Sequence, residues 1–133
     1  MSQENVASLR QALDAFNRRD RAAWLARCDP EMENVPPRDW PESDTVRGSE
    51  AVWDFFVQAL DTWEAGPFQH FEAIDAGNDK VAMNIRREVR GKASGVSLTW
   101  SYWQLVAFHN GKIVRSEWFA SRGEALEAVG LTE

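Results

Sequence analysis

The chain has 133 residues, 44% of them hydrophobic and 27% charged, with a formal net charge of −6. This length and composition predict a single domain over residues 1–133 with a buried core. The negative charge argues against nucleic-acid and anionic-membrane partners, and no apolar run reaches the roughly 18 residues of a transmembrane helix. The polar first residues lack the features of a signal peptide, and Cys28 is a lone cysteine, so we expect a reduced, cytoplasmic protein.

The first part of the chain is predicted to be helical. Apolar residues at helical spacing predict a first helix over residues 4–18: Val6, Leu9, Leu13 and Phe16. Asp20 is a suitable N-cap for a short second helix, which ends at Asp29-Pro30 and carries Trp24, Leu25 and Cys28. Residues 32–35 are predicted to form a short strand.

A proline-rich segment follows, with Pro36, Pro37, Trp40 and Pro41. Its fixed backbone angles predict a loop, which is either a surface connection or a lid over a cavity. Gly48 or Ser49 then caps a third helix. This helix is strongly amphipathic, and its apolar face holds Val52, Phe55, Phe56, Ala59, Leu60 and Trp63.

Four strands joined as an antiparallel meander are predicted next, over residues 68–76, 81–90, 97–108 and 112–120. The last two form a long hairpin, because Asn110-Gly111 is a preferred sequence for a type I′ turn. Residues 124–129 predict a final short helix. Helices followed by an antiparallel sheet indicate an α+β fold. We expect one curved sheet around the third helix, with a conical cavity between them.

Side chains alternate between the two faces of a strand. Over residues 81–90, one face holds Val81, Met83, Ile85, Arg87 and Val89, and the other holds Ala82, Asn84, Arg86, Glu88 and Arg90. On the hairpin, the side chains expected to face the cavity are Trp100, Tyr102, Gln104, Ser116 and Trp118. Those expected to face outward, against a second subunit, are Trp103, Leu105, Glu117 and Phe119. The seven tryptophans fit both interface or core packing and an aromatic-lined pocket.

Four motifs resemble the SnoaL-like branch of the nuclear transport factor 2-like superfamily: Arg47-Gly48-Ser49-Glu50-Ala51, Ile74-Asp75-Ala76-Gly77, Gly111-Lys112-Ile113-Val114 and Glu124-Ala125-Leu126-Glu127-Ala128. The resemblance implies a cone-shaped α+β barrel, with N-terminal helices packed in the concave face of a curved antiparallel sheet. It also implies a homodimer formed through the sheet face. The superfamily includes polyketide cyclases, ketosteroid isomerase, limonene epoxide hydrolase and non-catalytic binding domains, so the fold leaves the function open.

The likeness to ketosteroid isomerase does not extend to its catalytic groups. The general base of that enzyme falls on Pro36, and its two hydrogen-bond donors fall on Ala12 and Gln104. Only the Gln104 amide can donate, and nothing remains to take the proton. We therefore do not expect this isomerase reaction.

The likeness to limonene epoxide hydrolase keeps more of the expected groups. Asn34 matches an asparagine that orients the attacking water, while Arg86 and Glu88 match an arginine and an acidic residue two positions on. Residues two apart on a strand share a face, so both are expected to lean into the cavity. The catalytic base and a water-holding tyrosine fall on Trp118 and Met32, which puts hydrolysis by that mechanism in doubt.

A polyketide cyclase needs a carboxylate or imidazole at the cavity floor. His109 abuts the hairpin turn and is expected to be exposed, whereas the spacing leaves the direction of His70 open. Ser121 or Ala120 stands where many relatives have an aspartate. The sequence shows neither metal-ligand spacing nor a nucleotide-binding motif, so we expect no metal and no cofactor.

Three hypotheses follow. The first is binding of a small, mostly apolar molecule in the cavity, by Asn34, Arg86, Glu88, Trp100, Tyr102, Gln104 and Trp118. The second is a hydrolase, cyclase or isomerase at the same site, with Glu88 as acid or base, Arg86 as its partner and Asn34 orienting water or a carbonyl. The third is a non-catalytic module that forms a homodimer, in which tryptophans cover the interface.

Overall fold

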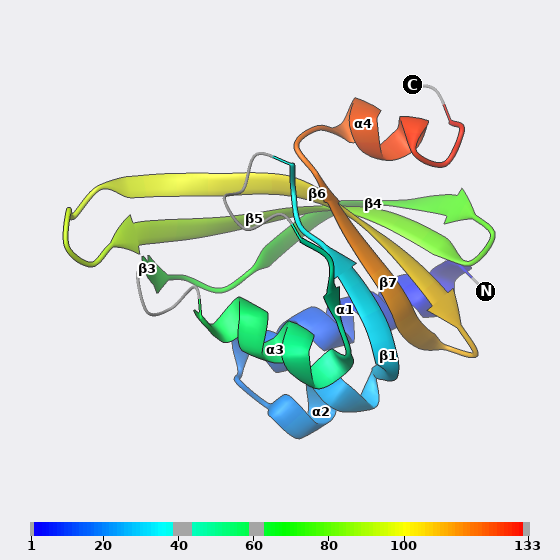
Figure 1. The fold of residues 1–133 in the computed structure, drawn as a ribbon. Coiled ribbons are helices and arrows are strands. Elements are labelled where there is room, and N and C mark those ends of the chain that lie inside the picture. Colours follow the sequence, from blue (N-terminus) through cyan, green and yellow to red (C-terminus); the bar gives the residue numbers. More distant parts are fainter. Residues whose placement is uncertain (1, 39–43, 59–62, 132–133) are drawn as a thin grey trace.

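The computed structural model describes residues 2–38, 44–58 and 63–131 (Figure 1). Its helices are α1 (Ser2–Asn17), α2 (Arg21–Ala26), α3 (Ser49–Gln58) and α4 (Arg122–Glu127). Its strands are β1 (Cys28–Val35), β2 (Val46–Arg47), β3 (Trp63–Ala65), β4 (Gln69–Gly77), β5 (Lys80–Gly91), β6 (Ser97–His109) and β7 (Lys112–Phe119). The predicted α+β class and the antiparallel meander after the third helix are confirmed.

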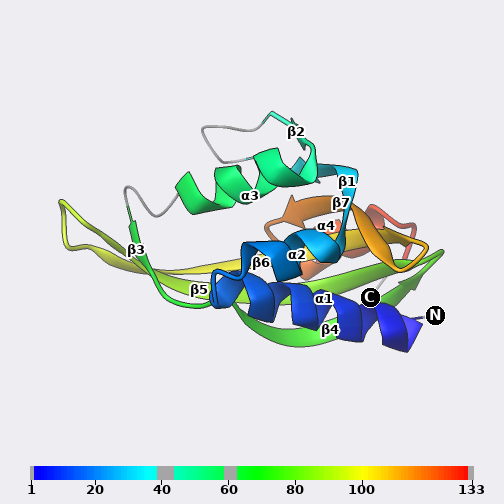
Figure 2. The same ribbon diagram turned by 90° about the horizontal axis from the view of Figure 1, so that it is seen from below.

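The strands form one curved sheet in the order β2-β1-β7-β6-β5-β3, and β4 also pairs with β5. Strands β4 to β7 pair antiparallel in succession, whereas β1 runs parallel to β7 and places Asn34 opposite Ser116. Helices α1, α2 and α3 lie on one side of the sheet and α4 on the other (Figure 1). In the view from below (Figure 2), the first two helices cross in front of the strands. This arrangement confirms that the N-terminal helices pack in the concave face.

The core lies between α1 and the inner face of the sheet. Leu9, Leu13 and Phe16 recur every three or four residues along α1 and are at most 6% exposed. They pack in one cluster with inner-face side chains of the sheet: Val81, Met83, Ile85 and Val106. The Asp20 carboxylate accepts a hydrogen bond from the Ala23 N–H at 3.1 Å, so the predicted cap of α2 is confirmed.

The hairpin of β6 and β7 forms as predicted. Asn110 and Gly111 have φ angles of 51° and 77°, and a type I′ turn requires positive φ at both central positions. His109 and Lys112 pair on either side of this two-residue turn. A bulge between Ala107 and Phe108 shifts the register by one residue, so that Gln104 pairs with Trp118.

Helix α4 covers part of the outer face of the sheet. Its Ala125 is completely buried in one cluster with Trp103 and Leu105, which face outward on β6. The Ser121 hydroxyl accepts a hydrogen bond from the Glu124 N–H at 3.2 Å and caps the helix. The prediction that a second subunit covers Trp103 and Leu105 is wrong, because the C-terminal helix folds back over them.

Two element boundaries also differ from the prediction. Cys28 begins β1 and pairs with Ile113 of β7, rather than lying in α2. Trp63 begins β3 and pairs with Gly91, rather than lying in α3. Each residue fits the helical spacing of the preceding helix, but the sheet uses it instead. The predicted apolar positions 59 and 60 lie outside the described residues.

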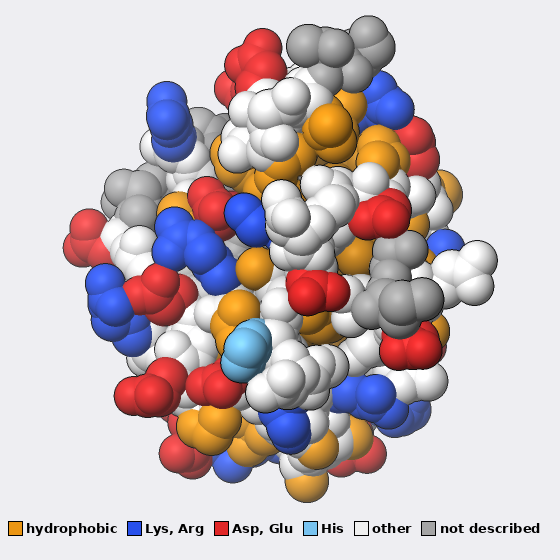
Figure 3. Space-filling model, turned by 90° about the vertical axis from the view of Figure 1, so that its right-hand side faces the viewer, with side chains coloured by type: hydrophobic (Ala, Val, Ile, Leu, Met, Phe, Trp, Pro, Cys, Tyr) orange, Lys and Arg blue, Asp and Glu red, His pale blue; other side chains and the backbone are white. Residues whose placement is uncertain are grey.

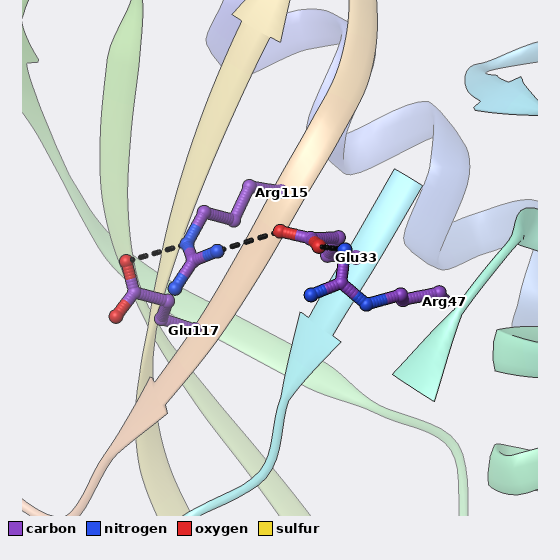
Figure 4. Close-up of polar contacts among 4 residues, drawn as sticks. All are labelled: Glu33, Arg47, Arg115 and Glu117. Carbon is purple, nitrogen blue, oxygen red and sulfur yellow. Dashed lines mark hydrogen bonds and ion pairs between the residues drawn. The ribbon is translucent and has the colours of Figure 1, made fainter. Parts of the chain in front are cut away.

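Four charged side chains on the outer face link β2, β1 and β7 (Figure 4). Arg115 Nη1 contacts Glu33 Oε1 at 2.8 Å, and Arg115 Nε contacts Glu117 Oε1 at 3.1 Å. Arg47 pairs with the same Glu33. The network joins the parallel strands from the solvent side, where ion pairs contribute modestly. It also engages Glu117 away from the cavity, as the alternation of β7 predicts.

The surface on the side shown in Figure 3 carries acidic and basic side chains interspersed over the described residues. Such a mixed surface lacks the clustered positive charge that typifies nucleic-acid binding. None of the helices in the described part of the chain has the length and apolar character needed to cross a membrane.

Candidate functional site

A small, partly open cavity lies between α3, the end of β1 and the inner face of β5 to β7. Its volume is about 40 Å³, enough for a few water molecules. The described side chains that line it are Asn34, Pro36, Pro37, Phe55, Phe56, Phe68, Arg87, Trp100, Tyr102 and Trp118. A second cavity of about 30 Å³ lies nearer α1 and includes Gln104 and Ser116 in its wall.

Three aromatic rings line both cavities: Phe56, Phe68 and Trp118. The Phe56 and Trp118 ring centroids lie 6.0 Å apart in an edge-to-face contact, and the Phe68 and Trp118 centroids lie 6.4 Å apart. Asn17, at the end of α1, holds the Phe68 backbone with two hydrogen bonds of 2.8 and 2.9 Å. These three rings belong to the walls of both cavities, which therefore adjoin each other.

Asn34 places an amide in the wall of the first cavity. The parallel pairing of β1 with β7 brings it beside Trp118, whose indole N–H donates to Asn34 Oδ1 at 2.9 Å. An indole nitrogen can only donate, so this contact fixes which amide atom is the oxygen. Asn34 is completely buried, and its Nδ2 has no hydrogen-bond partner among the described residues.

Arg87 places a guanidinium in the same wall. It lies on the inner face of β5 opposite Trp100, and it is only 3% exposed. Its Nε donates to the Gly66 carbonyl at 2.8 Å, its guanidinium carbon lies 4.2 Å from the Phe68 ring centroid, and its Nη2 has no partner. Burial lowers the pKa of Arg87 to about 10, and the positive charge of Arg19 adds to this effect. The side chain is still charged at neutral pH.

Gln104 and Ser116 contribute polar atoms to the second cavity. The Gln104 Nε2 lies 2.7 Å from the Ser116 hydroxyl, and the Gln104 Oε1 is buried without a partner. A hydroxyl both donates and accepts, so either atom of the amide satisfies this contact. In either orientation one polar atom of Gln104 remains unpaired beside the cavity.

The structure brings together five of the predicted site residues. Asn34, Trp100, Tyr102 and Trp118 line the first cavity, and Gln104 lines the second. Pro36 and Pro37 are buried in the wall of the first cavity. The rest of the predicted loop, with Trp40 and Pro41, lies outside the described residues, so its role as a lid stays a prediction.

Arg86 and Glu88 lie on the opposite face of β5, and both are exposed. The Arg86 guanidinium carbon lies 4.5 Å from the Phe71 ring centroid, and its Nε donates to Asn84 Oδ1 at 3.2 Å. The prediction that these two side chains lean into the cavity is wrong. The inner face of β5 carries Arg87 instead, because its alternation follows the buried apolar residues of this strand.

The remaining candidates of the sequence lie away from both cavities. His109 is exposed, as predicted, and His70 lies half-buried on β4 outside the cavity linings. Cys28 is buried, and this burial raises the pKa of its thiol to about 12, which makes it an unreactive core residue at neutral pH. The described residues contain no group of three or more metal-ligating side chains.

Two larger hollows are open grooves on the surface. One, of about 500 Å³, lies beside β3 and the far end of β5 and includes Glu88 and Thr99. The other, of about 630 Å³, lies between β7 and α4. Three buried polar atoms without partners belong to residues that line the two smaller cavities, and none belongs to a residue of these grooves. The Ser8 hydroxyl is also unpaired but lies outside all four hollows. The two smaller cavities are therefore the better candidate site.

The family follows from a comparison with known sequences. A model of the SnoaL-like domain matches residues 9–116. The chain belongs to the SnoaL-like domain family. The match contains α3, the strands from β4 to the first part of β7, and every described residue that lines the first cavity except Trp118. No protein among the curated ones matches this SnoaL-like domain.

Solved structures share the fold at low sequence identity. An NTF2-like protein of unknown function from Burkholderia pseudomallei is 23% identical, with a TM-score of 0.76 over 96% of this chain and 98% of that chain. An NTF2-like protein from Burkholderia thailandensis is 24% identical, with a TM-score of 0.77 over 88% and 90%. TerC, crystallised with polyporic acid, is 21% identical, with a TM-score of 0.75 over 95% and 98%.

The side chains that line the two cavities determine which chemistry they can support. Neither cavity has an aspartate, glutamate, histidine or lysine among the described residues of its wall. These residues therefore supply no carboxylate or imidazole for general acid–base catalysis. The surface of the first cavity is mainly apolar and aromatic. The charge of Arg87 and two unpaired hydrogen-bond donors, Asn34 Nδ2 and Arg87 Nη2, are buried in its wall.

Proposed function

We propose that this SnoaL-like domain binds a small, mostly apolar organic molecule in the cavity between α3 and the sheet. The observation that supports this is an aromatic wall behind which Asn34 and Arg87 each hold a buried polar atom without a partner. Apolar and aromatic walls with a few oriented polar groups are typical of small-molecule sites. TerC, which has a similar fold, was crystallised with an organic compound, polyporic acid.

The size of the cavity places a condition on binding. Pockets for organic ligands usually measure roughly 300–1,000 Å³, whereas this cavity measures about 40 Å³. Joining the two cavities, of about 40 and 30 Å³, does not reach that size. A ligand therefore has to push the aromatic rings apart and enlarge the space. Phe56 and Trp118 are half-buried rather than fully packed, so these two rings are the ones we expect to move.

Thermal unfolding with a panel of small aromatic compounds tests the proposal. The wild type is compared with Trp118→Phe, which removes the donor to Asn34, and with Phe71→Leu. Phe71 is a matched control, because it is an aromatic residue that is 50% exposed beside Arg86 on the outer face. A compound at 100 times its dissociation constant adds about 2.7 kcal/mol to the free energy of unfolding.

We expect at least one compound to stabilise the wild type and the Phe71→Leu variant equally. Trp118→Phe should weaken its binding about tenfold, which corresponds to about 1.4 kcal/mol. The proposal fails if no compound stabilises the wild type, or if both variants lose affinity to the same extent.

A further inference from the structure

We infer that the molecule bound in this cavity carries an anionic oxygen, of the carboxylate, phenolate or enolate kind, which pairs with the Arg87 guanidinium. The inference rests on the proposed function and names the chemical class of its ligand. It follows from three properties of the cavity wall: an unbalanced charge, the direction of its unpaired hydrogen bonds, and the aromatic surface around them.

The charge of Arg87 has no counter-ion in the described part of the chain. No carboxylate there lies within ion-pair distance of this side chain, although it is only 3% exposed. A second cation adds to the first, since the guanidinium carbons of Arg19 and Arg87 lie 4.6 and 5.9 Å from the Phe16 ring centroid. Burial of a charge without a partner is costly, and the contact with Phe68 compensates only part of that cost.

The unpaired polar atoms of the first cavity are both donors. Arg87 Nη2 is a donor at any pH near neutrality, and Asn34 Nδ2 is a donor because the Trp118 indole occupies the amide oxygen. Water can accept from both atoms, but it cannot balance the positive charge. Once the aromatic rings of the wall move aside, an anionic oxygen can accept from Arg87 Nη2 and balance its charge, through a charge-assisted hydrogen bond.

The rest of the wall defines the body of the ligand. Trp100 stands opposite Arg87 across the β5–β6 pair, and Phe55, Phe56 and Trp118 complete an apolar enclosure. A flat apolar or aromatic body fits against such rings. The ligand class is therefore a small organic acid whose anionic end points to β5 and whose body lies among the aromatic rings.

Matched acid and amide pairs test this class by isothermal titration calorimetry at pH 7.5. The probes are benzoate and benzamide, cinnamate and cinnamamide, and 2-naphthoate and 2-naphthamide, each with the wild type, Arg87→Met and Arg86→Met. Arg86 is the matched control, because this neighbour has the same charge but lies exposed on the opposite face of β5. Circular dichroism checks that each variant is folded.

We expect the wild type and Arg86→Met to bind at least one acid ten or more times more tightly than its amide. Arg87→Met should lose this preference. If Arg87→Met does not fold, Arg87→Lys keeps the charge with fewer donors and should reduce the preference without removing it.

The possible failures can be told apart. Equal affinity of the wild type for acids and amides overturns the inference and leaves the proposed function standing. An acid preference that survives Arg87→Met overturns the assignment to Arg87. If Arg87→Met does not fold, an acid preference that is undiminished in Arg87→Lys overturns it in the same way. If the wild type binds neither member of any pair, both the inference and the proposed function fail.

Discussion

Replacement of Arg87 by methionine should leave the ligand-free protein about as stable as the wild type. Removal of one partner from a buried ion pair usually costs about 3–5 kcal/mol, because the other charge is left unpaired. Arg87 has no such partner among the described residues, and its one side-chain hydrogen bond there runs from Nε to the Gly66 carbonyl at 2.8 Å. Methionine is unbranched and adapts to the space that the arginine stem leaves.

The expected magnitude comes from three contributions. Burial lowers the pKa of Arg87 from 12.5 to about 10, and at about 1.36 kcal/mol per unit this is roughly 3 kcal/mol of desolvation cost that methionine avoids. Loss of the hydrogen bond to Gly66 costs about 1.5–3 kcal/mol, and loss of the contact with the Phe68 ring costs about 1 kcal/mol. The contributions nearly cancel, so the free energy of unfolding should change by no more than about 1 kcal/mol.

Urea unfolding at pH 7, followed by circular dichroism, measures this change. Arg86→Met is the control, because an exposed substitution on the outer face should change stability by less than about 0.5 kcal/mol. A loss of more than about 3 kcal/mol in Arg87→Met would refute the reasoning. Such a loss would mean that the protein itself balances the charge of Arg87, and that no ligand is needed to do so.

Three further predictions concern other parts of the molecule. Burial raises the pKa of Cys28 from 9.0 to about 12, so its contribution to stability is complete below pH 9 and is lost as the pH rises from 9 towards 12. The free energy of unfolding should fall by about 1.4 kcal/mol at pH 10 from this cause. Urea unfolding of Cys28→Val at the same pH should not show this decrease. Gly111→Ala should cost about 1 kcal/mol in the same assay, because φ is 77° although nothing lies within 4 Å of the new Cβ. Gly123→Ala in α4, without a positive φ, should not destabilise the protein. If the protein forms a homodimer through the exposed outer face, sedimentation at micromolar concentration should give twice the monomer mass, and Phe71→Lys should weaken the dimer. A wild type that sediments as a monomer would contradict the predicted homodimer.

Local patterns in the sequence predicted most of the elements. The spacing of Leu9, Leu13 and Phe16 is visible without a structure, and Asn110-Gly111 specifies its turn by backbone conformation alone. The inward direction of four hairpin side chains also followed from strand alternation: Trp100, Tyr102, Gln104 and Trp118. These features depend on neighbours within a few residues, which is why the sequence reveals them.

The prediction for β5 placed the wrong face of the strand toward the cavity. Arg87 stands in the same alternating stripe as Val81, Met83 and Ile85, and a charged residue in an apolar stripe is itself a signal of function. The likeness to an epoxide hydrolase pointed to Arg86 and Glu88 instead. A shift of one residue exchanges the two faces of a strand, so the charge beside the cavity was assigned to the wrong arginine.

Contacts between distant segments were not predictable from local patterns. The hydrogen bond between Trp118 and Asn34 joins residues 84 positions apart, across a parallel strand pair that no turn connects. The position of α4 over Trp103 is equally non-local, because an outward-facing aromatic residue is suited both to a second subunit and to a helix of its own chain.

The parallel pairing of β1 with β7 makes the cavity a late product of synthesis. Residues 28–35 leave the ribosome well before residues 112–119, and until then β1 can pair only with the two residues of β2. Contacts over such a separation form slowly, because a long loop has to close first, and an unpaired strand edge stays open to other chains meanwhile. The hydrogen bond between Asn34 and Trp118 can therefore form only after β7 has been synthesised. A chain that stops short of β7 lacks α4 and also Trp118, which lies in the walls of both cavities.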